Sequence, residues 1–328
     1  MHRVILDTDP GIDDAMAIAF ALCHPDIELL ALTTVFGNVS VEQSTRNARY
    51  LLECFGANEV AVARGAAVPS VQAPLPYADF VHGADGLGNV HPAEELSYRT
   101  EARHARLARS DAAGFIIETA REMPGELVLV AIGPLTNVAA ALAREPELPS
   151  LVRELIVMGG ALDEPGNVSP LAEANFWNDP HAADAVLGAD WPATVVGLDV
   201  THRIMVHDEH LAQLRDEAGE TGDLLWRSSR FYVDFYAARA GDGVRACAMH
   251  DAAALVHAIM PEAFEHVVGG ARVVPDGMAA GQLALDRSGH DYPMPHWSGR
   301  PGTAVCTAVD AARVRACFLE AIVRHHRR

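Results

Sequence analysis

Lysine is absent from the 328-residue chain, so all 25 basic side chains are arginine. This absence excludes enzymes that form a Schiff base on lysine, and those that hold a phosphate with the lysine of a P-loop or a kinase. Basic charge is scarce overall, because the formal net charge is −19. Nucleic-acid binding normally requires a basic surface that displaces counterions, so no nucleic-acid partner is expected.

Long apolar runs and paired cysteines are missing as well. Half of the residues are hydrophobic, but no stretch of 18 consecutive apolar residues occurs, so no membrane span is expected. No signal-peptide pattern precedes the first strand-like stretch, which makes a cytoplasmic location the expectation. The five cysteines lack the spacing of a zinc site or a redox pair, so we expect them to be free thiols that behave as small buried hydrophobes.

Short apolar runs alternate with helical patterns along the chain, which is typical of a parallel sheet covered by helices. The expected strands span residues 3–7, 27–35, 60–63, 127–132, 154–158, 193–197, 282–286 and 303–309. The expected helices span residues 12–23, 41–54, 110–122, 135–144, 224–238 and 310–324. The pattern predicts an α/β fold in one domain, residues 1–328, with an open, mostly parallel, Rossmann-like sheet and helices on both faces.

Ligands of such sheets bind at the carboxyl ends of the strands, so functional residues are expected there. The stretch 65–97 is rich in proline, glycine and alanine, and is too long for a simple connection. We therefore expect it to be a binding loop. A second irregular stretch, 288–302, contains three prolines.

Four carboxylates, those of Asp7, Asp9, Asp13 and Asp14, lie within eight residues where the first expected strand ends and the first expected helix begins. Acids this close repel one another unless a positive charge lies among them. Helix capping would account for one or two of them, but not for four. Carboxylates without histidine or cysteine neighbours favour a hard cation, calcium or magnesium, over zinc. The motif therefore predicts a metal site.

The segment DTDPGIDDAMAI, residues 7–18, resembles the N-terminal signature of the inosine-uridine-preferring nucleoside hydrolases. Further matches follow in the family's order over most of the chain: TTVFGN at 33–38, HG at 82–83, GPLTN at 133–137, MGG at 158–160, EAN at 173–175, DP at 179–180 and HD at 250–251. The resemblance implies the nucleoside hydrolase fold and a calcium-dependent cleavage of ribonucleosides to base and ribose. It also implies a homo-oligomer, either a tetramer or a dimer.

In that family a calcium ion is bound by carboxylates of the opening motif, by a backbone carbonyl and by a distant aspartate. Carried over, the resemblance implies Asp9, Asp14, the carbonyl of Ile132 and Asp251 as ligands, with the attacking water and two ribose hydroxyls completing the sphere. Asp9 is then the candidate general base toward the water. His250 is the candidate donor of a proton to a departing purine.

The remaining matched residues are expected to bind the nucleoside. Those that correspond to ribose contacts or to braces of the metal ligands are Asp13, Asn38, Asn167, Glu173 and Asn175. Ala174 stands where many relatives have phenylalanine, so the pocket wall is expected to differ there.

Contacts with the base are less determined by the sequence. His82 is expected near the base or over the site. Tyr232 and Tyr236 share one face of a helix, where they either stack on the base or pack in the core. Met158 packs either against the sugar or in the core. The base preference and the role of Asp7 are left open.

Two other functions share the acidic motif. Haloacid-dehalogenase-like phosphatases also carry a DxD sequence after an N-terminal strand, but they need a positive side chain, usually lysine, on the phosphate. A non-catalytic, calcium-dependent ribose-binding protein would keep the metal ligands without turnover. The absence of lysine, together with the DPG and paired DD sequences, argues against the phosphatase. The presence of Asp9 and His250 favours the hydrolase over the binding protein.

Overall fold

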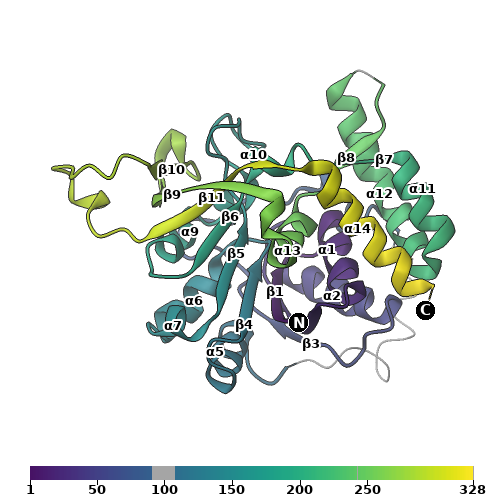
Figure 1. The fold of residues 1–328 in the computed structure, drawn as a ribbon, viewed down its shortest axis with the longest axis horizontal. Coiled ribbons are helices and arrows are strands. Elements are labelled where there is room, and N and C mark those ends of the chain that lie inside the picture. The colour runs from purple at the N-terminus through teal and green to yellow at the C-terminus, as the bar shows by residue number, and fades with distance from the viewer. Residues whose placement is uncertain (91–107, 242, 328) are drawn as a thin grey trace.

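A computed structural model describes residues 1–90, 108–241 and 243–327 and places a nine-stranded sheet at the centre of the fold (Figure 1). The strand order is β10-β9-β11-β6-β5-β4-β1-β2-β3. The seven strands from β11 to β3 are parallel, whereas β9 is antiparallel to β10 and β11. The strands of the sheet are β1 (His2–Thr8), β2 (Ile27–Thr34), β3 (Ala61–Arg64), β4 (Leu127–Ala131), β5 (Glu154–Met158), β6 (Ala193–Val196), β9 (Phe264–Val273), β10 (Leu283–Asp286) and β11 (Gly302–Val309).

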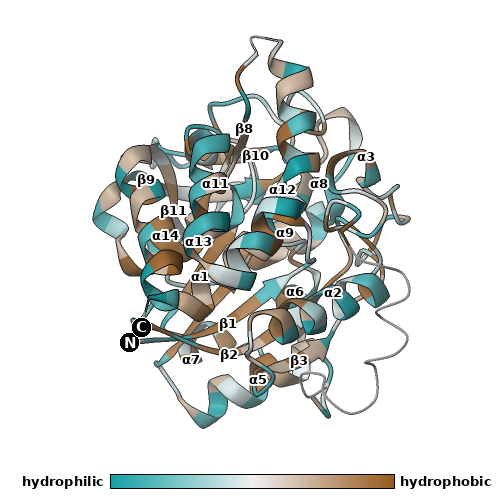
Figure 2. Cartoon of the chain, turned by 90° about the vertical axis from the view of Figure 1, so that its right-hand side faces the viewer, coloured by the Kyte–Doolittle hydropathy of each residue, from teal (hydrophilic) through white to brown (hydrophobic). Residues whose placement is uncertain are grey.

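Helices cover both faces of this sheet, as predicted, and apolar strands lie between them (Figure 2). Alternate residues of β1 point to opposite faces. Val4 and Leu6 belong to the apolar cluster on one face, and Ile5 belongs to the cluster on the other. The helices over the first cluster are α1 (Ile12–Cys23), α2 (Val41–Cys54), α12 (Gly219–Ala240), α13 (Asp251–Ile259) and α14 (Ala311–His326). Those over the second are α5 (Ala112–Glu122), α6 (Thr136–Arg144) and α9 (Pro180–Leu187). Because one sheet carries both clusters, we infer a single domain.

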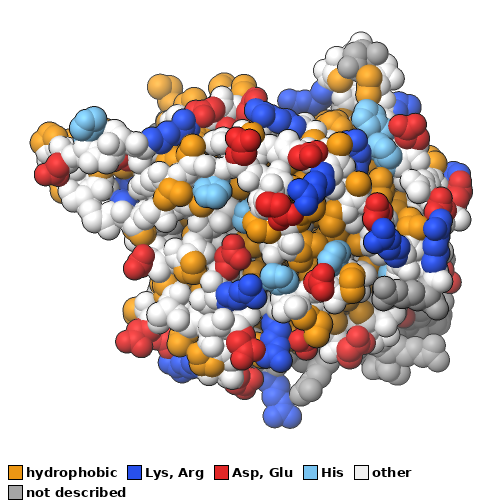
Figure 3. All heavy atoms as spheres, viewed as in Figure 1, with side chains coloured by type: hydrophobic (Ala, Val, Ile, Leu, Met, Phe, Trp, Pro, Cys, Tyr) orange, Lys and Arg blue, Asp and Glu red, His pale blue; other side chains and the backbone are white. Residues whose placement is uncertain are grey.

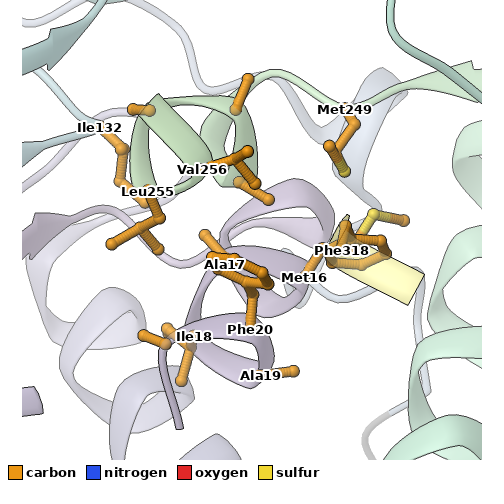
Figure 4. Close-up of a cluster of buried hydrophobic side chains, with 14 of the residues drawn as sticks. Met16, Ala17, Ile18, Ala19, Phe20, Ile132, Met249, Leu255, Val256 and Phe318 are labelled. Atoms are coloured by element: carbon orange, nitrogen blue, oxygen red, sulfur yellow. The ribbon is translucent and has the colours of Figure 1, made fainter. Parts of the chain in front are cut away.

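Helix α1 is buried along almost its whole length. Its apolar residues pack against α13 and α14, with Phe20 stacked on Phe318 at 6.1 Å between ring centroids (Figure 4). A helix that is apolar on all sides belongs in a protein interior. This packing fixes the first turn of α1, which carries Asp13 and Asp14.

The carboxyl end of β1 lies at the point where the chain changes direction across the sheet. From β1 the chain continues to β2 and β3 on one side, and later to β4, β5 and β6 on the other. The crevice formed at such a point is the usual ligand site of an open parallel sheet. The opening acidic motif follows β1 and therefore lies at this crevice.

Several elements were not predicted: β9, α9, α11 (Asp208–Glu217), α13 and the small pair β7 (Met205–His207) and β8 (Ala246–Ala248). Within the predicted loop 65–97, α3 (Asp79–His82) forms, and residues 91–97 lie outside the described residues. The second irregular stretch projects from the edge of the sheet between β10 and β11 (Figure 1).

The described residues can be compared with the expectations of no membrane span and of free cysteines. None of the helices there is long and apolar enough to cross a membrane. The five cysteines are free, with Cys23, Cys247 and Cys306 buried. Acidic and arginine side chains are interspersed over the face shown in Figure 3, so the negative charge is not gathered in one patch there.

Candidate active site

Asp14 organises the turn between β1 and α1. Its Oδ2 accepts hydrogen bonds from the Gly11 amide at 2.8 Å and the Asn38 side chain at 3.2 Å. Its Oδ1 accepts from the Thr8 hydroxyl at 2.5 Å and from the Asp9 amide at 3.2 Å. The donors are all neutral, so the carboxylate is fixed in place while its negative charge has no counterion among them.

Asp9 is buried beside this turn and keeps one oxygen without a partner. Its Oδ2 accepts from the Asn38 amide at 2.6 Å, while its Oδ1 makes no hydrogen bond. A Cβ at Gly37 would lie 2.0 Å from Oδ2, and one at Gly133 would lie 2.6 Å from Oδ1. Only glycine fits at these two positions. Burial, and then the neighbouring acids, raise the pKa of Asp9 well above its usual range, so the carboxylate is a strong base.

Three carboxylates converge at this point from two segments of the chain. Asp13, Asp14 and Asp251 each offer an oxygen, and these atoms all lie within 4.8 Å of one another. All three side chains are buried, and burial raises the pKa of Asp13 and Asp14 to about 6 and that of Asp251 well above its usual range. Asp13 keeps its Oδ1 without a partner. Such a group can hold a divalent cation.

This group differs from the predicted ligand set by one residue, because it contains Asp13 in place of Asp9. The charge of Asp9 still contributes to the raised pKa of Asp251. The carbonyl of Ile132, predicted as the backbone ligand, accepts a hydrogen bond from the Asn175 side chain at 2.8 Å. A carbonyl oxygen has two lone pairs, so one is left for a cation.

The expected ribose-binding residues divide into a buried and an exposed part. Glu173 is buried and accepts backbone N–H groups of Asn175 and Gly160, each at 2.8 Å, and burial raises its pKa to about 6. Asn175 is also buried, and its amide donates to the Met158 carbonyl at 3.2 Å. Asn167 is exposed and accepts from the Ala174 amide at 3.0 Å, which places it at the first turn of α8 (Ala174–Asn178).

An aromatic wall defines the opposite side of the site. Tyr232 and Tyr236 of α12 contact each other edge to face at 5.0 Å between centroids. The Tyr232 hydroxyl donates to Asp13 Oδ2 at 3.4 Å, and its ring stacks on His82 at 5.5 Å. The Tyr236 hydroxyl lies 2.8 Å from His250 Nε2. Burial lowers the pKa of His250 to about 3 and that of His82 to about 4.

Asp7, whose role the sequence left open, braces the site from behind. Its Oδ1 accepts from the Thr33 hydroxyl at 2.5 Å and from the Asn137 side chain at 2.8 Å. Asn137 also donates to the Thr34 carbonyl at 3.0 Å and accepts from the Ala66 amide at 2.8 Å. One buried amide thus joins β1, β2, α6 and the start of the long loop. Sequence reasoning did not identify this contact, although Asn137 lies in the matched GPLTN segment.

We expect Asn137→Ala to lower the free energy of unfolding by about 2–4 kcal/mol, because it leaves the Ala66 amide without its partner and removes one of the two hydrogen bonds that Asp7 Oδ1 and the Thr34 carbonyl each accept. Urea unfolding followed by circular dichroism measures this loss. The control is Asn58→Ala at an exposed position, for which a change within about 0.5 kcal/mol is expected. Equal stabilities of the two variants would contradict the prediction.

The family model described as "Inosine-uridine preferring nucleoside hydrolase" matches residues 4–316. The chain belongs to this family. The resemblance drawn from the ordered motifs is confirmed, and this nucleoside hydrolase is an enzyme that hydrolyses ribonucleosides.

Individual relatives agree over almost the full length of this nucleoside hydrolase. It is 37% identical over 326 residues to "Probable uridine nucleosidase 1" of Oryza sativa subsp. japonica, covering 98% of each chain. The solved plant nucleoside hydrolase PpNRh1 is 37% identical, with a TM-score of 0.90 and coverage of 98% of this chain and 99% of that one. A purine-preferring ribonucleoside hydrolase from Gardnerella vaginalis is 32% identical, with a TM-score of 0.88 and 99% of each chain covered.

Proposed function

We propose that this nucleoside hydrolase cleaves the N-glycosidic bond of ribonucleosides, uridine among them, with a calcium ion bound by Asp9, Asp14, Asp251 and the carbonyl of Ile132. The observation that carries the proposal is the buried acidic group in the sheet crevice. Uncompensated carboxylates are costly to bury, and a cation removes that cost. Oxygen-only donors in this number favour calcium, which takes six to eight oxygen ligands in flexible geometry.

The residues present fit such an ion. Asp9 and Asp13 each keep a buried oxygen without a partner, next to the fixed carboxylate of Asp14. We assign Asp9 to the ion and to the water, and Asp13 to a ribose hydroxyl. A bound divalent cation lowers the pKa of a water ligand, and so supplies a nucleophile at neutral pH.

The chain's own residues then divide the work of hydrolysis. Asp9 takes the proton of the attacking water at its free Oδ1. Asp13, Asn38, Glu173 and Asn175 hold the ribose hydroxyls, with Asn167 at the rim. Matched donors and acceptors favour ribose over deoxyribose, because a missing hydroxyl leaves buried polar groups unpaired.

The aromatic wall faces the base in this proposal. Tyr236 is partly exposed beside His250, and we assign it to contact with the base, while His82 and Met158 complete that wall. His250 donates a proton as the base leaves. Relatives named for uridine and for purines both resemble this chain, so we propose uridine as one substrate without excluding purine nucleosides.

A nucleoside panel tests the proposal. Incubation with uridine and inosine is expected to release free ribose, measured by a reducing-sugar assay. Chelation with EGTA is expected to suppress the release, and added calcium to restore it. Deoxyuridine serves as the matched control and is expected to react much more slowly. Binding of nucleosides without ribose release from any member of the panel would leave the non-catalytic ribose-binding alternative standing.

Two finer expectations stay predictions: a homo-oligomer, tetramer or dimer, and a cytoplasmic location. The first rests on the family resemblance, and the second on the sequence features given above.

A further inference from the structure

Thr201 lies outside every matched motif, yet its side chain contacts His250. It is the last residue of α10 (Leu198–Thr201), a short helix that begins directly after β6 at the carboxyl edge of the sheet. The side chain is fully buried, and its Oγ1 lies 2.7 Å from Nδ1 of the His250 ring. This distance is that of a good hydrogen bond.

The helix that carries Thr201 is held rigidly on both sides. Leu198 and Val200 are fully buried in the apolar cluster under α1. Asp199 is buried and accepts backbone N–H groups of residues 162–164, at distances from 2.7 to 3.2 Å. The Thr201 amide itself donates to the Gly197 carbonyl at 3.1 Å. The hydroxyl is therefore presented to the histidine from a fixed point.

Both nitrogens of the His250 ring have a hydroxyl partner. Tyr236 faces Nε2 at 2.8 Å, and Thr201 faces Nδ1 at 2.7 Å. His250 is the N-terminal flanking residue of α13, but its side chain makes no capping hydrogen bond to that helix. The two hydroxyls are therefore the hydrogen-bond partners of the ring, which also contacts His202 edge to face at 5.5 Å between centroids. In the proposed function Tyr236 also contacts the base. Thr201, on α10, does not.

We propose that Thr201 is a positioning residue for the departure of the base: its hydroxyl accepts the Nδ1 proton of His250 and so directs Nε2 toward Tyr236 and the leaving group. The inference rests on the proposed role of His250. His250 enters this step as the imidazolium, with one proton on each ring nitrogen and the second proton taken from solvent. The bond from C1′ to the base nitrogen breaks with its electron pair on the base, the base takes the Nε2 proton, and the ring becomes neutral. The water adds to C1′ and gives its proton to Asp9. The ring keeps its Nδ1 proton, which remains hydrogen-bonded to Thr201 Oγ1.

The test separates positioning from packing by the choice of leaving group. Inosine has a poor leaving group that needs a proton, whereas 4-nitrophenyl β-D-ribofuranoside releases a stable anion without one. Both substrates need the same ribose and metal contacts. Thr201→Val keeps the shape of the side chain and removes its hydroxyl, and Thr201→Ser keeps the hydroxyl. Thr201→Ala is the second hydroxyl-free variant, in case the valine protein does not fold.

We expect Thr201→Val to lower kcat for inosine by about 10- to 100-fold, with KM changed by less than about threefold. The kcat for the nitrophenyl riboside is expected to change by less than about threefold, and Thr201→Ser is expected to restore inosine cleavage. Equal losses on the two substrates would show a packing role and overturn the inference, as would full activity of the hydroxyl-free variants on inosine.

His250→Ala distinguishes failure of this inference from failure of the proposed function. If His250→Ala slows inosine selectively and Thr201→Val does not, only the positioning role of Thr201 is wrong. If His250→Ala slows both substrates equally, the leaving-group role of His250 is wrong, and the inference falls with it.

Discussion

Asp9→Asn is expected to lower kcat for ribose release by at least about 10³-fold, because the proposed general base and its proposed electrostatic contact with the ion are lost together. The amide cannot accept the proton of the attacking water. The substitution is nearly isosteric, and its amide oxygen still accepts the Asn38 amide that Asp9 Oδ2 binds at 2.6 Å. The fold is therefore expected to persist. Steady-state kinetics with uridine measure the loss.

The control is Asp291→Asn, which removes one acid from an exposed segment distant in sequence from the site. Its kcat is expected to match the wild-type value. Thermal unfolding in the presence of EGTA shows whether Asp9→Asn is folded, and the variant is expected to be no less stable than the wild type, because burial raises the pKa of Asp9 well above its usual range. A kcat within about tenfold of wild type would remove Asp9 from the role of base.

The sheet could be predicted because each strand is marked by a pattern of residues within its own short stretch of sequence. Buried parallel strands are short apolar runs between amphipathic helices, and β1, β2, β4, β5 and β6 each begin and end within two residues of the prediction. Strand β9 was not predicted, because its sequence carries two adjacent glycines and several exposed residues, as suits a strand near the edge. The position of the acidic motif followed from its place after the first strand.

The partners within the site were less predictable, because they depend on distances between segments far apart in the chain. The sequence placed Asp13 with the ribose and Asp9 with the metal, whereas the carboxylate oxygens of Asp13, Asp14 and Asp251 are the ones that cluster within 4.8 Å. Thr201 gave no signal of its own beyond following a buried strand, and Asn137 was marked only by its place in the matched GPLTN segment. A general search for small polar residues after each parallel strand would have included both.

Removal of calcium is expected to destabilise the protein most strongly at neutral pH. In the folded protein burial raises the pKa of Asp13 and Asp14 to about 6, from the ordinary 3.8. Below pH 3.8 these carboxyls are protonated in both the folded and unfolded states and carry no penalty. Between 3.8 and about 6 only the folded state keeps the protons, so stability falls as the pH rises. Above about 6 the penalty is complete unless a cation offsets it.

Calcium is therefore expected to raise Tm at pH of about 7.5 by about 5–10 °C, and by much less at pH of about 5, where protons compete for the same oxygens. Differential scanning fluorimetry with EGTA or excess calcium measures both shifts. Buried histidines act in the opposite direction, because burial lowers the pKa of His82 and His250 and their contribution to stability is lost as the pH falls. The wild type must therefore be compared with a variant that keeps both histidines.

Asp14→Asn provides that comparison, because it removes one buried charge from the cluster and leaves the histidines in place. At pH of about 4 in EGTA it is expected to be less stable than the wild type, because its NH2 group cannot accept the two hydrogen bonds that one Asp14 oxygen accepts. Its stability relative to the wild type is expected to rise as the pH increases from about 4 to about 7, because the buried charge of Asp14 then destabilises only the wild type. The variant is also expected to lose most of the calcium-dependent gain in Tm. A relative stability that falls with rising pH would show that the buried charge of Asp14 does not destabilise the folded protein. A calcium response equal to that of the wild type would show that Asp14 is not a ligand of the ion.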